Sequence, residues 1–268
     1  TDEDYAGRIN VSKDSARSVY AEQLDISEDE RAHIQALYDG DILEADALMG
    51  RVIHSIDRRD LFDESIVVFS SDHGEELYQH NKFVEHGCSI YDSVLHVPLM
   101  MRFPDKRWAG ARIPDVVGLI DLMPTLLDLL GVEKLPSFQG ESFSGRLTDG
   151  TRKDFSAVIS EHYRRRQGGE VLSIRTARWR YIYNPKGVSP YCLPAKGHYP
   201  IDAEELYDHR SDPQELENVV HLHPQVVARL RKELLQRYPP MDGGSDPLET
   251  DDPETLDRLK ALGYIEDE

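Results

Sequence analysis

Residues 66–76, IVVFSSDHGEE, join a run of four apolar residues to a dense polar cluster. The apolar run is continuous rather than alternating, which favours a strand buried on both faces of a parallel sheet. Ligands of open α/β sheets bind beyond the carboxyl ends of strands, so we expect Asp72 and His73 to face a site. Such a carboxylate and imidazole can form a metal pair. The alternative is an aspartate that caps a following helix beside a partly exposed histidine.

The sequence around this strand predicts alternating helices and strands. Ser27 and Glu30 fit a capping box, and apolar residues then recur at helical spacing to about Asp57. A helix followed closely by a buried strand is typical of α/β proteins. Two further helices and one further strand are predicted at 89–95, 121–130 and 97–101.

The pattern changes beyond residue 155, where a strand at 157–159 precedes two alternating runs at 172–175 and 181–183. The two runs predict an antiparallel hairpin, and Pro224 begins a predicted helix to about Tyr238. The predicted fold class is therefore α/β, with a mostly parallel sheet flanked by helices and a smaller C-terminal α+β portion. The predicted division is a connecting segment, a metal-bearing α/β portion, the α+β portion and an acidic tail with a short terminal helix, at 1–26, 27–150, 151–238 and 239–268.

The amino-acid composition of the chain disfavours some classes of binding partner. The chain has 31 Lys and Arg against 50 Asp and Glu, a net charge of −19, which disfavours nucleic acid and anionic membranes as main partners. No apolar run reaches the roughly 18 residues that a membrane span needs. The first ten residues are polar and acidic, unlike a signal peptide. Two cysteines are too few for a disulfide framework or a cysteine zinc site.

A second polar cluster, QHNKFVEHG at 79–87, contains His80, Lys82, Glu85 and His86. Beside a metal ion, its titratable groups would suit an anionic substrate, because they could bind its oxygens and protonate a leaving group. A solvated surface loop is the alternative interpretation of this cluster.

Residues 66–99 resemble the signature of the sulfatase family within the alkaline phosphatase superfamily. Further segments are similar to that family and occur in its order. They are 36–46, 121–127, 206–218 and 259–264, so the resemblance extends from about residue 30 to the C-terminus. Each segment is weak evidence alone, but the ordered set is strong.

The resemblance implies roles for particular residues. Asp72 and His73 resemble the pair that binds a divalent cation, commonly Ca²⁺, although an imidazole ligand keeps Zn²⁺ and Mn²⁺ open. His86 corresponds to a substrate-contacting residue and is the candidate catalytic residue. His80 and Lys82 are candidate substrate-binding residues, Lys82 in a supporting role. In the implied reaction a formylglycine hydrate attacks sulfur, the metal neutralises the sulfate oxygens, and a cationic side chain assists the leaving group.

One part of the family pattern is missing. Neither the paired-aspartate metal motif nor the Cys/Ser-x-Pro-x-Arg segment that yields formylglycine occurs before residue 60. Cys192 begins an imitation of the second motif, but Lys196 replaces its arginine and the segment follows the metal pair instead of preceding it. We therefore expect the C-terminal part of a sulfatase-like hydrolase, with formylglycine in the missing N-terminal part.

The expected partners are a small sulfated substrate, a glycan or aryl ester, and an N-terminal sulfatase half. A phosphodiesterase or phosphonate hydrolase of the same superfamily is the first alternative function. A noncatalytic fragment, or a subunit that needs a separate N-terminal chain, is the second. The resemblance favours a periplasmic or extracellular location, which the residues themselves leave open.

Overall fold

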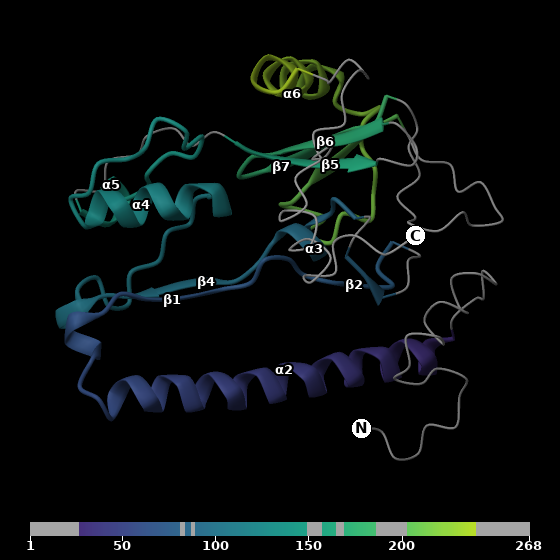
Figure 1. Ribbon diagram of the computed structural model, residues 1–268. Helices are drawn as coiled ribbons and strands as arrows, with labels where there is room; N and C mark the ends of the chain where they lie inside the picture. The colour runs from purple at the N-terminus through teal and green to yellow at the C-terminus, as the bar shows by residue number, and fades with distance from the viewer. Residues whose placement is uncertain are drawn as a thin grey trace, which may run out of the picture.

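The computed structural model describes residues 27–80, 84–86, 89–148, 157–164, 169–185 and 203–239. A long helix, α2, runs beside a two-stranded ribbon, and a four-stranded sheet covered by helix α6 lies on the other side of that ribbon (Figure 1). Among these residues, no helix is long and apolar enough to cross a membrane. The Lys82, Cys88 and Cys192 positions and the acidic tail lie outside the described residues.

Helix α2, Glu28–Asp57, begins where the capping pattern predicts. The Glu30 N–H donates to Ser27 Oγ at 3.3 Å, and the Ser27 N–H donates to Glu30 Oε2 at 2.9 Å. These two bonds satisfy donors that the first helical turn cannot pair internally. Farther along the helix its apolar side chains are exposed, with Leu43 at 71% and Ile42, Leu48, Met49, Val52 and Ile53 also open to solvent.

Strand β1, Val67–Ser70, pairs with β4, Leu99–Arg102. The pairing is antiparallel, and Ser70 lies opposite Leu99. All strand pairs in the described ranges are antiparallel, which differs from the mostly parallel sheet that the apolar run predicts. The difference has a simple reason. A continuous apolar run carries no information about the direction of the neighbouring strand. The run also predicts burial on both faces, whereas the residues of β1 are only half-buried in this two-stranded ribbon.

Short elements connect the ribbon to the rest of the molecule. Strands β2 and β3, Glu76–Leu77 and Val84–Glu85, form a small antiparallel pair. The predicted helix at 121–130 is confirmed as α4, Leu122–Leu129. The remaining short elements are η1 Phe62–Glu64, α3 Asp92–Leu95, η2 Pro104–Lys106, η3 Leu119–Asp121 and α5 Gly145–Thr148.

The C-terminal sheet has the order β5-β6-β7-β8, with neighbouring strands antiparallel. Leu172 pairs with Tyr183, which confirms the predicted hairpin. The strands are β5 Val158–Arg164, β6 Gly169–Arg175, β7 Trp179–Tyr183 and β8 Glu204–Asp208. Helix α6, Pro224–Arg237, lies over this sheet (Figure 1).

The sheet uses its two faces differently. Successive side chains of a strand point to opposite faces, so one face collects Leu172, Ile174, Tyr181 and Leu206 against Leu230 and Leu234 of α6. All six side chains are fully buried. The opposite face carries Val171, Ile182 and Tyr207, which pack with Ile90. The second face therefore connects the sheet to the segment that precedes α3.

Candidate functional site

The candidate site begins where β1 ends. Asp72 and His73 lie just beyond Ser70, the last residue of this strand, with one residue between. The Ser71 hydroxyl donates to the His73 carbonyl oxygen at 2.7 Å, which closes a tight turn. The turn leaves the Asp72 side chain 84% exposed and the His73 side chain 41% exposed.

Gly74 holds this turn against α3. Its N–H donates to the carbonyl oxygen of Val94 at 2.7 Å. A Cβ atom at residue 74 would lie 2.2 Å from the carbonyl oxygen of Ser93, far inside van der Waals contact. Only glycine allows the two backbones to approach this closely. The residue therefore fixes the position of the turn relative to α3.

The Asp72 carboxylate is ionised, and its oxygens are accessible to a ligand. The His73 N–H donates to Asp72 Oδ1 at 3.0 Å. This hydrogen bond is the main reason that the pKa of Asp72 is lowered, and the nearby His73 ring adds to the effect. A carboxylate that already prefers its charged form is ready to bind a cation.

The His73 ring is oriented for the same purpose. Nδ1 lies 2.9 Å from the Gly74 carbonyl oxygen. A carbonyl only accepts hydrogen bonds, so Nδ1 carries the hydrogen and the lone pair of the neutral ring is on Nε2. Nε2 lies 3.7 Å from Asp72 Oδ2. A backbone carbonyl that fixes the tautomer in this way is typical of metal-binding histidines, and the two residues fit a divalent cation.

His86 comes from a different segment and lies against this pair. Its ring stacks on His73 with centroids 4.1 Å apart and an angle of 18° between the planes. Its Nδ1 lies 2.9 Å from Oε2 of Glu75. The side chain of His86 is 52% exposed, whereas that of Glu75 is 16% exposed. The structure thus brings His86 against His73, thirteen residues earlier in the sequence, and so beside the Asp72–His73 pair.

His80 occupies a more enclosed position than its sequence neighbours. Its Nδ1 lies 3.1 Å from Glu76 Oε1, and its Nε2 lies 2.9 Å from the carbonyl oxygen of Glu215. Both partners accept hydrogen bonds, so both ring nitrogens of His80 donate to the protein. The ring also stacks on Tyr91 with centroids 3.9 Å apart. This geometry gives His80 a supporting position, and its assignment to the substrate stays a prediction.

Glu76 is a buried hydrogen-bond acceptor that holds this loop to α3 and His80. Its side chain is fully buried and accepts from the Ser89 and Ser93 hydroxyls at 2.7 Å each, and from His80. Burial alone would raise the pKa of this carboxyl. The hydrogen bonds and the charge of His80 outweigh burial and lower the pKa overall. The buried carboxylate is therefore ionised and well partnered.

Glu215 joins this loop to the C-terminal sheet. Its backbone adopts the left-handed conformation, with φ of 57°, which a residue with a side chain rarely occupies. Its carboxylate accepts from Arg180 Nε at 2.5 Å and from the Asp92 N–H at 2.8 Å. Its carbonyl oxygen accepts from His80. A single buried residue thereby contacts the loop, α3 and β7.

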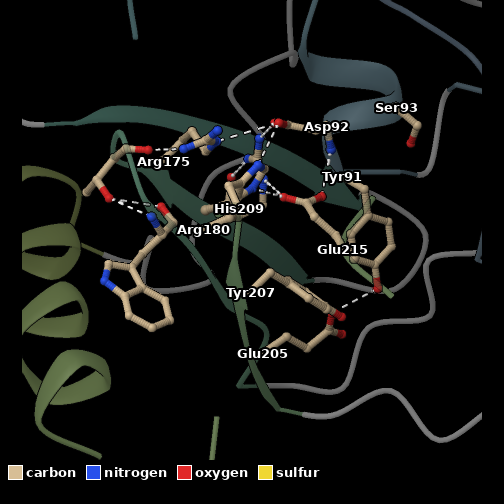
Figure 2. A network of polar contacts seen from close by, with 12 residues as sticks. Tyr91, Asp92, Ser93, Arg175, Arg180, Glu205, Tyr207, His209 and Glu215 are labelled. Atoms are coloured by element: carbon tan, nitrogen blue, oxygen red, sulfur yellow. Dashed lines mark hydrogen bonds and ion pairs between the residues drawn. The ribbon is translucent and has the colours of Figure 1, made fainter. Parts of the chain in front are cut away.

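A network of charges surrounds Glu215 (Figure 2). Asp92 contacts Arg180 and Arg175, and His209 bridges the two carboxylates with Nδ1 3.3 Å from Asp92 and Nε2 2.7 Å from Glu215. Burial would raise the pKa of Asp92, but the arginine charges lower it overall. Asp92, His209 and Glu215 could in principle hold a metal ion. Two guanidinium groups already neutralise these carboxylates, so the group is better explained as a buried ion-pair network.

The sequence alone assigns no role to Glu75, Glu76 or Glu215. The first two follow the metal pair directly, and their adjacency to His73 was a usable signal. Glu215 lies within the segment 206–218 that resembles the family, where nothing in the local sequence indicates burial or contact with residue 80. Such long-range contacts become visible only in three dimensions.

The chain matches two known family profiles. The sulfatase family profile matches residues 2–132. The profile for the C-terminal region of N-sulphoglucosamine sulphohydrolase matches residues 83–239, more than half of the chain. The two profiles together cover the loop after β1, the α3 segment and the C-terminal sheet with α6.

Individual relatives agree with the family profiles. Arylsulfatase K of Homo sapiens is 31% identical over 209 residues, which are 75% of this chain and 36% of that protein. The phosphonate monoester hydrolase SpPMH of Silicibacter pomeroyi superposes with a TM-score of 0.63 and 26% identity, over 81% of this chain and 43% of that one. A protein solved with its substrate D-glucosamine-2-N,6-O-disulfate superposes with a TM-score of 0.57 and 24% identity, over 73% and 38% of the two chains. The chain therefore spans well under half the length of these relatives, and their folds confirm the alkaline-phosphatase-like α/β class.

Proposed function

Since the chain belongs to the sulfatase family of the alkaline phosphatase superfamily, we propose that the protein hydrolyses sulfate esters with the help of a divalent metal ion. The observation that carries this proposal is the grouping of Asp72, His73 and His86 at the carboxyl end of β1. A carboxylate, an oriented imidazole and an exposed second imidazole are suited to an anionic ester, which needs positive charge around its oxygens.

Asp72 and His73 would hold the metal ion. The ion would supply positive charge beside the sulfate oxygens when it is bound. Ca²⁺ is the proposed ion because of the family resemblance, and Zn²⁺ or Mn²⁺ are the alternatives because one ligand is an imidazole. Two residues do not complete a coordination sphere, so further ligands must come from other parts of the protein.

The proposed substrate is a small sulfated molecule, either a glycan or an aryl ester. The name of the human relative and the disulfated glucosamine bound by a structural neighbour support these two classes. His86 would contact the ester and assist its leaving oxygen, and His80 and Lys82 would contribute positive charge nearby. The charge of −19 does not oppose this, because a metal ion and the 80–86 segment would reverse its sign locally.

We also propose that an N-terminal sulfatase half completes the active site and supplies formylglycine. The exposed apolar side chains of α2 and the open two-stranded β1–β4 ribbon support such a partner, because apolar surface of this extent is unusual on a protein that is fully assembled. Met100 on β4 is 60% exposed, and Ile120 and Met123 are 56% and 50% exposed. A periplasmic or extracellular location belongs to this proposal and rests on the family resemblance alone.

Phosphonate ester hydrolysis is the second candidate function. The structural likeness to a phosphonate monoester hydrolase favours it, since phosphonate and sulfate esters present similar tetrahedral anions. Assays of the full-length gene product with 4-nitrophenyl sulfate and 4-nitrophenyl phenylphosphonate, with added Ca²⁺, Zn²⁺ or Mn²⁺, separate the two. Faster metal-dependent turnover of the sulfate supports the proposal, and exclusive turnover of the phosphonate contradicts it.

The metal assignment predicts the effect of an Asp72→Ala, His73→Ala double substitution. We expect calorimetric titration of the 268-residue chain to show at least about tenfold weaker binding of the preferred ion, because both ligand atoms are lost. The matched control is Asp39→Ala with His54→Ala, an exposed pair on α2. Equal affinity of both double variants would defeat the assignment.

A further inference from the structure

Glu75 lies beside the proposed metal pair, and its ligand atom and those of His73 and His86 are all within 4.8 Å of one another. Its carboxylate Oε2 lies 2.9 Å from Nδ1 of His86, eleven residues later in the sequence. The Glu75 side chain is only 16% exposed and the adjoining Glu76 is fully buried, so the carboxylate stands on a fixed part of the loop. His86 is more exposed and comes from the separate segment that contains β3.

The contact determines which nitrogen of His86 remains available. A carboxylate only accepts hydrogen bonds, so the hydrogen of the neutral ring is on Nδ1. The stacking of His86 on His73 fixes the plane of the ring as well. Nε2 has no hydrogen-bond partner among the described residues and is the nitrogen left to face a ligand.

We propose that Glu75 is a positioning residue, which accepts from Nδ1–H of His86 and so directs Nε2 toward the leaving oxygen of the substrate ester. In the imidazolium form Nε2 carries the second hydrogen and gives it to that oxygen as the bond between this oxygen and sulfur breaks, which leaves the neutral ring with its hydrogen on Nδ1. The inference rests on the proposed function for its substrate and on the hydrogen bond for its geometry. The arrangement is a carboxylate that orients an imidazole, and the imidazole in turn acts on the substrate. Glu75 itself does not touch the substrate.

The first test reads the tautomer of His86 directly. In the 268-residue chain labelled with ¹⁵N-histidine, at pH 8, NMR should show the hydrogen of His86 on Nδ1, with the signal assigned by its loss in His86→Gln. Glu75→Ala should shift the hydrogen toward Nε2, whereas Glu75→Gln keeps an acceptor oxygen and should retain Nδ1–H. The exposed Glu133→Ala is the matched control. An unchanged tautomer in folded Glu75→Ala overturns the proposal.

The second test uses leaving groups of different basicity in the full-length gene product. Glu75→Ala should lower kcat for phenyl sulfate at least about tenfold more than kcat for 4-nitrophenyl sulfate, because the poorer leaving group depends more on assistance. Glu75→Gln should recover most of this loss. An equal loss for both esters indicates a structural role and overturns the proposal. If the wild type hydrolyses neither ester, the proposed function is refuted instead. The NMR measurement of the His86 tautomer then tests the positioning role of Glu75 independently of activity.

Discussion

Glu76 is a fully buried carboxylate surrounded by two hydroxyls and an imidazole. We predict that Glu76→Ala lowers the free energy of unfolding by about 3–5 kcal/mol, because Ser89, Ser93 and His80 lose their shared acceptor. Urea denaturation at pH 7 measures this loss. Glu64→Ala, which removes an exposed carboxylate in η1, is the matched control and should change stability little.

The lowered pKa of Glu76 should also make the stability of the protein depend on pH. The pKa of Glu76 is lower in the folded protein than its ordinary value of 4.5. Its stabilising contribution is therefore fully present above about pH 4.5, and it is lost as the pH falls through the lower folded value. We expect Glu76→Gln to lose less stability than the wild type between pH 6 and pH 3.5. Parallel stability profiles of the two proteins would contradict this prediction.

The turn after β1 and helix α3 are held together by a close backbone approach at Gly74. We predict that Gly74→Ala destabilises the protein by about 1–3 kcal/mol, because the new Cβ atom would clash with the Ser93 carbonyl. The turn should also move, which would weaken metal binding at Asp72 and His73. Thermal unfolding and metal titration measure the two effects.

Gly40 provides the matched control for this substitution. It lies inside α2, and a Cβ atom there would meet nothing within 4 Å. Gly40→Ala should stabilise the protein by about 0.5–1 kcal/mol, since alanine restricts the unfolded chain more than glycine does. Equal effects of the two substitutions would show that the close approach at Gly74 does not matter.

In the molecule as a whole, buried charges connect the C-terminal sheet to the segment that carries the site. Arg180, only 2% exposed, contacts both Glu215 and Asp92 (Figure 2). We predict that Arg180→Ala costs about 3–5 kcal/mol of stability, because two carboxylates lose their main cation in a buried environment. Arg178→Ala removes an exposed guanidinium that also pairs with a carboxylate, Asp208, and should cost far less. If urea denaturation shows similar losses of unfolding free energy for Arg180→Ala and Arg178→Ala, the prediction that the buried network stabilises the protein is contradicted.

The local sequence was enough for features that depend on neighbours along the chain. The capping box at Ser27, the strand before Asp72 and the antiparallel hairpin all follow from local spacing and residue type. The ordered motifs also indicated the sulfatase family, which the family profiles confirm. The exposure of the apolar residues on α2 was not foreseen, because helical spacing predicts an apolar stripe without saying what covers it.

Sequence therefore indicated the family, the three main helices, the strand before Asp72 and the C-terminal hairpin, because each rests on residue types at short spacing. It also gave the Asp72–His73 pair as a metal-site prediction. Tertiary structure alone established that β1 and β4 are antiparallel, that His86 lies against His73, and that Glu75 and Glu215 act as partners of histidines. Glu215 lies 135 residues from His80 in the chain, and no local pattern encodes such a contact. The chain must fold before distant carboxylates and imidazoles can meet.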